Sequence, residues 1–238
     1  MNNTGDAQDL SRFDISEEEK DKLVAEVIRY ILFKTHQSSG CPIKRDELIQ
    51  IVTKNYHQRA LPAAVIEQAK EKLSNIFGYE LKELQRSRPS TKTQTRFSQL
   101  SVADTRSYIV ISQLPANVFQ KHVEDINTAP LTGFTFVIVS IVYLAGGKIS
   151  EENLWHHMRR MGLQETDENH SSLGNIKLLL ETLVQQRYLQ KDKLNGPEGN
   201  SVLYELAERT LDGEVYQKIK AYVSQIVNKD LGTVEVDD

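Results

Sequence analysis

The sequence predicts a mainly helical α+β protein built from two tandem winged-helix (helix-turn-helix) domains. Three consecutive segments in the first half carry apolar residues at helical spacing, and two short β-type segments follow them. The same order, three helices and then a hairpin, occurs again in the second half. Repetition of one supersecondary unit indicates a distant duplication, so we expect two small domains rather than one large domain.

Length and turn signals divide the 238 residues into six consecutive segments. In order, we expect a disordered tail at 1–15, winged-helix domain A at 16–111, a linker at 112–129, winged-helix domain B at 130–206, a C-terminal helix at 207–228 and an acidic tail at 229–238. The first segment is predominantly polar, which is typical of a disordered tail.

Three helices are expected in the first domain. Ser16 and Glu19 have the spacing of a capping box, which begins the first helix. Rows of apolar residues at spacing four extend this helix to a Ser-Ser-Gly stretch that ends it. The second helix opens at Lys44, and the third has Pro62 in its first turn and stops at Gly78.

Two strands, at 79–84 and 108–111, complete the first domain. The polar segment 85–107 between them is predicted to be an unusually long wing loop. It is basic, with Arg86, Arg88, Lys92, Arg96 and Arg106 against one acid, Asp104. This loop is a second, weaker candidate for contact with nucleic-acid phosphates.

The second domain repeats this order. Its first helix contains the longest apolar stretch of the chain, 134–145. Ser150 caps the next helix, and Ile176 belongs to the third. Strands at 188–191 and 202–206 are joined by a Gly-Pro-rich turn at 195–200. A final helix after this hairpin carries the apolar row Val215, Ile219, Tyr222, Val223 and Ile226.

Composition and motifs argue against catalysis and membrane insertion. The longest apolar stretch is shorter than the ~20 residues of a membrane span. The N-terminal segment is polar and has no apolar run behind a basic start, so we expect no secretory signal. Cys41 is the only cysteine, which excludes an intrachain disulfide and a multi-thiolate zinc site and favours a reducing compartment. No metalloprotease, phosphate-loop or dinucleotide-binding motif occurs. The neighbours His156 and His157 point about 100° apart on a helix. We therefore expect no enzyme activity, no cofactor and no metal.

Charge limits any contact with nucleic acid to a local patch. The net charge is −4, from 29 basic and 33 acidic residues, so the chain is not a general polyanion binder. Candidates for a local patch lie on or near the third helix and wing of the second domain: Lys177, Arg187, Lys191, Lys193, Arg159 and Arg160. The alternative is a solvated charged face.

Ordered blocks along the chain resemble the MAGE homology domain family from about Leu23 to Leu206. The first domain contributes VIRYILFK, CPIKRDELIQIV and LPAAVIEQAKEKLSNIFGYELKEL, and the second PLTGFTFVIVSIVYLAGGKISEENLWHHMRRMGL and LLLETLVQQRYLQ. The most specific segments are FGYELKEL, QQRYL and E-E-x-L-W. The family usually has a Trp-Gly-Pro-Arg run after the last strand, where this chain has Tyr204 and then Glu-Leu-Ala-Glu-Arg.

The resemblance implies a tandem winged-helix fold and a non-catalytic adaptor. In the family, a pair of leucines in the first helix binds RING-type ubiquitin ligases. The matching pair here is Ile31-Leu32, with Ile28 one turn before Leu32. The alternative is that these residues belong to the core-facing stripe of the helix. A groove for a kleisin helix, again with a core role as the alternative, has the candidates Trp155, Met158 and Met161.

Divergence from the melanoma-antigen branch favours the branch that serves in the SMC five–six chromosome-maintenance complex. The resemblance then implies three partners: a RING-type ubiquitin ligase subunit (non-SMC element one), a kleisin subunit (non-SMC element four) and double-stranded DNA bound without sequence preference. It also implies a nuclear location and a role in DNA repair and recombination. The alternative is a free-standing winged-helix transcription regulator, which acids such as Glu67 and Glu181 on the third helices disfavour.

Overall fold

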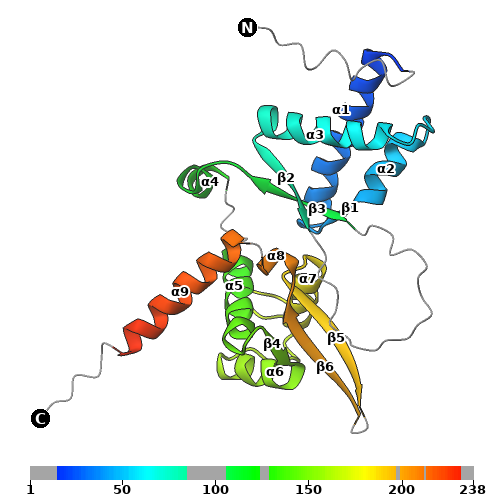
Figure 1. Ribbon diagram of the computed structural model, residues 1–238. Coiled ribbons are helices and arrows are strands. Elements are labelled where there is room, and N and C mark those ends of the chain that lie inside the picture. Colours follow the sequence, from blue (N-terminus) through cyan, green and yellow to red (C-terminus); the bar gives the residue numbers. More distant parts are fainter. Residues whose placement is uncertain (1–14, 85–105, 124–128, 197–198, 212, 232–238) are drawn as a thin grey trace, which may run out of the picture. The chain divides into compact units, whose positions relative to one another are not determined.

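The computed structural model describes residues 15–84, 106–123, 129–196, 199–211 and 213–231, which form two compact units (Figure 1). Among these residues the first unit ends at Pro115 and the second begins at Ala116. Most of the predicted wing loop 85–107 and of the two predicted tails lies outside the described residues.

The first unit consists of helices and a three-stranded antiparallel sheet. Its elements are α1 (Glu17–Gln37), β1 (Ile43–Lys44), α2 (Arg45–Thr53), α3 (Leu61–Phe77), β2 (Tyr79–Leu84) and β3 (Ser107–Ser112). Strand β3 is central: it pairs with β2 from Tyr79 opposite Ser112 onward, and with β1 where Ile43 lies opposite Tyr108. The two predicted strands are confirmed. Strand β1 was not predicted, because two residues give no alternating pattern.

Local sequence explains where the helices of this unit begin and end. The Ser16 Oγ accepts a hydrogen bond from the Glu19 N–H at 3.2 Å, and the Glu19 carboxylate accepts one from the Ser16 N–H at 3.0 Å, which confirms the predicted capping box. Hydrogen bonds from the Ser16 backbone and side chain lower the pKa of Glu19. Helix α3 ends at Gly78, whose φ of 67° is left-handed and suits a residue without Cβ.

The core of the first unit lies between its helices and sheet. Helix α1 contributes the buried residues Leu23, Val24, Val27, Ile28 and Ile31. The other elements contribute Ile43, Leu48, Val52, Leu61, Val65, Ile66, Ala69, Leu73, Leu81 and Tyr108. This packing fixes the angular position of α1, and so decides which of its side chains remain at the surface.

The second unit repeats this arrangement and adds helices before and after it. Its elements are α4 (Ala116–His122), α5 (Ala129–Leu144), β4 (Lys148–Ser150), α6 (Glu151–Arg160), α7 (Ile176–Gln185), β5 (Leu189–Gly196), β6 (Gly199–Leu206), α8 (Glu208–Leu211) and α9 (Gly213–Leu231). Strand β6 lies between β4 and β5. As predicted, Ser150 caps α6, and its Oγ accepts from the Asn153 N–H at 3.3 Å.

The predicted mainly helical, tandem winged-helix fold class is confirmed. Three elements differ from the expectations. Helix α4 lies within 112–129, which was expected to be a linker, and the short strand β4 was not expected. The segment after the second hairpin forms two helices, α8 and α9, where one was expected.

Helix α9 packs against α5 in the second unit. Val139 of α5 forms a small apolar cluster with Ile219 and Val223 of α9. The Phe136 and Tyr222 rings meet edge to face at a centroid distance of 4.7 Å. The larger core of this unit contains Phe134, Ile138, Val142, Ile149, Leu154, Trp155, Met158, Ile176, Leu180, Leu183, Leu189 and Tyr204. The final helix is thus part of the unit's packing.

Candidate functional site

The structure separates the residues predicted to bind a RING partner. Ile31 is fully buried in the core of the first unit, so its side chain does not reach the surface. Leu32 is half-buried, and Ile28 is 7% exposed. Leu32 and Ile28 both line a groove between α1 and α3, and Ile31 does not. Ile28 and Leu32 lie one helical turn apart and share a face of α1. Ile31 is adjacent to Leu32 in sequence, so its side chain points about 100° away from that of Leu32.

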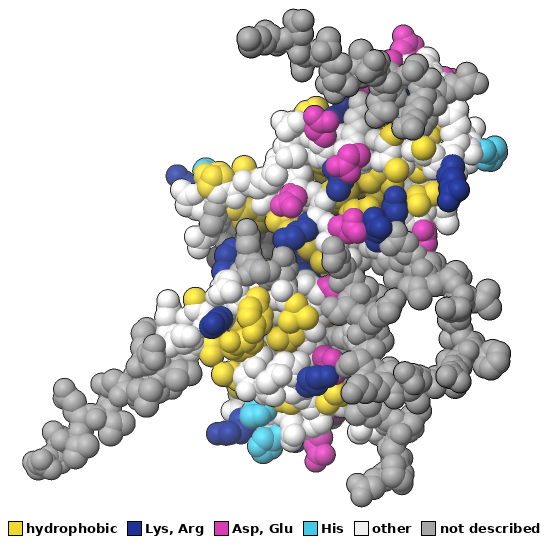
Figure 2. All heavy atoms as spheres, in the orientation of Figure 1, with side chains coloured by type: hydrophobic (Ala, Val, Ile, Leu, Met, Phe, Trp, Pro, Cys, Tyr) yellow, Lys and Arg dark blue, Asp and Glu magenta, His cyan; other side chains and the backbone are white. Residues whose placement is uncertain are grey.

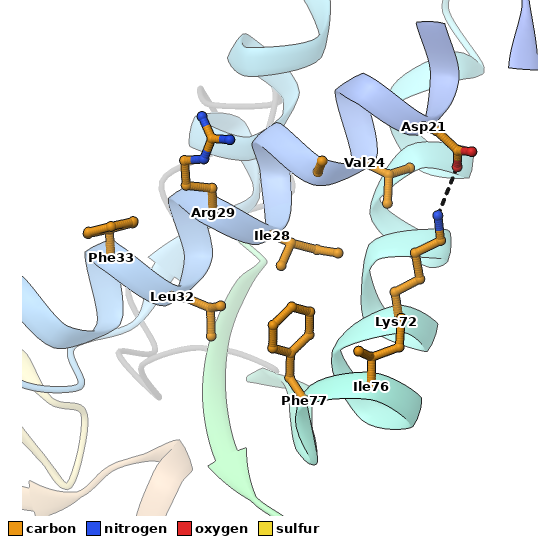
Figure 3. Close-up of a pocket in the computed structure, with 10 residues that line it drawn as sticks. Asp21, Val24, Ile28, Arg29, Leu32, Phe33, Lys72, Ile76 and Phe77 are labelled. Carbon is orange, nitrogen blue, oxygen red and sulfur yellow. Dashed lines mark hydrogen bonds and ion pairs between the residues drawn. The ribbon is translucent and has the colours of Figure 1, made fainter. Parts of the chain in front are cut away.

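The groove between α1 and α3 has a volume of about 370 Å³. Its walls are largely apolar: Val24, Ala25, Ile28, Leu32 and Phe33 come from α1, and Ile76 and Phe77 from the end of α3. Figure 3 shows Ile28 and Leu32 pointing toward Phe77, while Arg29 and Phe33 point away from α3. At one end, Lys72 Nζ lies 2.8 Å from Asp21 Oδ1, so these two charges compensate each other.

Three large apolar side chains at this groove are exposed to solvent. Phe33 is 64% exposed, Ile76 69% and Phe77 47%. Phe33 belongs to an apolar face of the first helix that is wider than a core-facing stripe needs, whereas the exposure of Ile76 and Phe77 was not predicted because it depends on where α3 ends. In Figure 2 hydrophobic side chains reach the surface in both units. A contiguous exposed apolar surface of this kind marks an interaction site.

A second hollow lies on the other side of Phe33, between α1 and α2. It is lined by Glu26, Arg29, Tyr30, Phe33 and Ile51, and its volume is about 330 Å³. Tyr30 Oη donates a hydrogen bond to Glu47, and partial burial together with this bond raises the pKa of Tyr30 to about 12. The hydroxyl of Tyr30 therefore already has a partner within the unit.

The residues predicted for a kleisin groove lie mostly in the core of the second unit. Met158 is fully buried and Trp155 is 4% exposed, whereas Met161, just after α6, is 46% exposed. Among the described residues the indole N–H of Trp155 has no hydrogen-bond partner. Trp155 and Met158 thus have the core role that was the alternative.

A different groove in the second unit lies between α5 and α9. Its volume is about 320 Å³, and it is lined by Leu131, Thr132, Thr135, Phe136, Val139, Gln186, Tyr188, Val215, Lys218 and Ile219. The apolar row of the final helix was visible in the sequence. Its pairing with α5 was not, because the two helices are distant along the chain.

Two of the cations predicted to contact DNA are held by acids of the same unit. Lys177 Nζ lies 3.0 Å from Glu165 Oε1. Arg187 donates two hydrogen bonds to Glu208, at 2.9 and 2.6 Å, and the two side chains are only 21% and 6% exposed. This bidentate pair links the end of α7 to α8 and leaves little of the guanidinium for a phosphate.

Lys191 is also engaged within the unit. Its Nζ donates to Glu181 at 2.6 Å and lies 3.6 Å from Glu151. Burial opposes the charged form, but hydrogen bonds with Glu181 and Tyr204 raise the pKa of Lys191. The remaining candidates, Arg159, Arg160 and Lys193, are exposed.

The part of the chain that the structure describes contains neither a metal-binding cluster nor a membrane-spanning helix. There, no group of three or more His, Cys, Asp or Glu side chains is placed to hold a metal ion. The same residues include no helix whose length and apolar character would let it cross a bilayer.

Comparison with known proteins gives consistent matches. The sequence model of the MAGE homology domain matches residues 27–215. The chain is 27% identical over 210 residues to the mouse non-structural maintenance of chromosomes element 3 homolog, covering 87% of this chain and 67% of the relative. The human homolog is 26% identical over 90% of this chain and 64% of its own length. Human melanoma-associated antigen F1 is 29% identical, over 78% of this chain and 53% of the relative.

A solved structure of an Nse1-Nse3-Nse4 complex contains a chain of similar fold. The TM-score is 0.72 at 25% identity, and the match covers 90% of this chain and 93% of the other. Because the match covers 90% of this chain, it includes residues of both units described above.

Proposed function

Because this chain belongs to the MAGE homology domain family, we propose that it is the Nse3-type subunit of an SMC five–six complex. Members of this family are non-catalytic adaptors. In this role the chain would act in the nucleus, in chromosome maintenance and DNA repair, and would bind an Nse1-type RING subunit and an Nse4-type kleisin. The name of the matching complex and the names of two relatives support the proposal.

The observation that carries the RING assignment is the exposed apolar groove between α1 and α3. Leu32 lines it, as do the exposed side chains of Phe33, Ile76 and Phe77. Aromatic side chains at the centre of an interface carry a large share of its binding energy. In this proposal Leu32 contacts the partner directly, and Ile31 supports the helix from the core.

The test is Leu32→Ala in binding measurements with the Nse1 homologue of the same organism. We expect a loss of at least roughly tenfold in affinity. Leu178→Ala is the matched control, because Leu178 is 65% exposed but lies on α7 in the second unit. Unchanged affinity for a folded Leu32→Ala variant would contradict the assignment.

For the kleisin we propose the α5–α9 groove rather than the vicinity of Trp155. The lining is largely apolar and includes a few polar residues such as Thr135 and Lys218, which suits an amphipathic helix. Leu131→Asp should weaken binding of the Nse4 homologue. Leu144→Asp should not, because Leu144 is 63% exposed on the same helix α5 but outside this groove. Equal effects of the two variants would count against the groove.

For DNA we propose weak, sequence-independent contact through the exposed cations Arg159, Arg160 and Lys193. Arg159→Ala with Arg160→Ala should weaken duplex binding equally for all sequences and lower the salt slope by about 2. Lys177→Ala should have less effect because Glu165 already compensates that charge. An unchanged salt slope in the double variant would exclude this patch. On α7, the 65% exposed Leu178 offers no hydrogen-bonding group to a base edge and the acid Glu181 is repelled by phosphates, which disfavours the transcription-regulator alternative.

A further inference from the structure

We infer that the RING partner brings a carboxylate to Arg29, flanked by apolar side chains that fill the hollows on either side of Phe33. This inference rests on the proposed RING interface and specifies the chemistry of the segment that binds there. Arg29 and Phe33 are the two residues that line both hollows, the α1–α3 groove and the α1–α2 hollow. They lie four residues apart on α1, so they form one ridge between the two depressions.

Arg29 is the cation of this surface that has no ion-pair partner among the described residues. It is exposed, and among the described residues it forms no ion pair or hydrogen bond. Other charges near the two hollows are paired: Asp21 lies 2.8 Å from Lys72. Glu47 accepts a hydrogen bond from Tyr30 and lies 3.7 Å from Lys34. A partner that covers both hollows must therefore also cover an unpaired guanidinium.

The chemistry of that guanidinium selects the partner. Covering a cation with apolar side chains alone removes its hydration without replacement, which is unfavourable. A carboxylate restores two parallel hydrogen bonds in a geometry that suits guanidinium. Glu26 also lines the α1–α2 hollow and forms no ion pair with Arg29 within the described residues. We therefore place the partner's acid over the ridge, on the side of Arg29 that faces away from Glu26.

The shape of the surface sets the spacing of the anchors. One apolar side chain would enter between Leu32 and Phe77, and another would enter beside Ile51. The acid would lie between these anchors, over the ridge. By charge complementarity, this surface should bind a segment with an acid between two apolar residues in preference to a basic or a purely apolar segment.

The test measures affinity for the Nse1 homologue of the same organism at low and moderate salt, using the full chain. Arg29→Glu should weaken binding at least roughly tenfold, and the loss should shrink as salt rises. Lys22→Glu is the matched control: it makes the same charge change on the same helix, but Lys22 lines neither hollow, so its effect should stay within about twofold. Thermal unfolding of each variant establishes that it is folded.

Charge reversal of single acids in the Nse1 homologue should then identify one that restores binding to Arg29→Glu. An affinity of the Arg29→Glu variant within about twofold of that of the unchanged chain overturns the inference. A loss of affinity no larger than that of Lys22→Glu does so too. Leu32→Ala, measured in parallel, reports on the interface itself. If Leu32→Ala weakens binding and Arg29→Glu does not, the proposed interface stands and only the acidic partner segment is rejected.

Discussion

Replacing Phe33 by Ala tests the α1 surface with the least disturbance of the fold. Phe33 is 64% exposed in the isolated chain. A phenylalanine side chain can bury about 150–250 Å², so roughly 130 Å² remains for a partner to cover. At about 25 cal/mol per Å², this burial would contribute about 3 kcal/mol. Since about 1.4 kcal/mol corresponds to tenfold in Kd, the variant should bind the Nse1 homologue roughly 100-fold more weakly.

The assay is isothermal titration calorimetry combined with thermal unfolding. The free energy of unfolding should change by less than about 0.5 kcal/mol, because little of the ring is buried in the fold. Leu178→Ala removes a side chain of nearly equal exposure, 65%, from the second unit, and it should leave Kd for the Nse1 homologue unchanged. A Phe33→Ala variant that binds as tightly as the unchanged chain would show that the ridge on α1 is not covered by this partner.

Three further predictions concern stability. Ile31→Ala should destabilise the first unit by roughly 2–4 kcal/mol in urea denaturation, since it opens a cavity in the core, and any loss of RING binding should parallel the loss of folded protein. Arg187→Ala should destabilise the second unit by roughly 3 kcal/mol, because it leaves the 6% exposed Glu208 carboxylate without its partner; a change below about 0.5 kcal/mol would contradict this. The pKa of Tyr30 is raised from 10.0 to about 12 in the folded chain. Its protonated hydroxyl therefore contributes fully to the free energy of unfolding below pH 10, and this contribution is lost as pH rises toward 12. Tyr30→Phe should reduce that alkaline loss in pH-dependent unfolding, and an identical pH profile would refute the assignment.

Local signals in the sequence were enough to predict most helices and strands. Ser16 and Ser150 begin a helix by accepting a hydrogen bond from a backbone N–H of its first turn, and Gly78 ends a helix by its left-handed backbone. A few neighbouring residues therefore determine these boundaries. The third strand of each sheet was missed because Ile43–Lys44 and Lys148–Ser150 are too short to show a period. These strands form only because β3 and β6 offer a free edge.

The functional residues were less predictable, because their roles depend on partners distant in sequence. Ile31 and Leu32 are adjacent and both apolar, yet only the packing of α1 decides that one is core and the other lines a groove. Trp155 likewise has the spacing of a groove residue and lies in the core. Arg187 was predicted to contact phosphate, but the fold places Glu208, 21 residues later, 2.6 Å from its guanidinium. Spacing identifies a helix face but not what that face meets.

One wall of the α5–α9 groove is supplied by a helix that follows the winged-helix module in the chain. A fragment that stops at Leu211 would retain α5, α6, α7 and the sheet, but it would lose Val215, Lys218 and Ile219 from the groove. Such a fragment would also expose Val139 to water. Mapping of the kleisin contact with shortened chains must therefore extend through Val223, or a negative result would reflect a missing wall rather than a missing interaction.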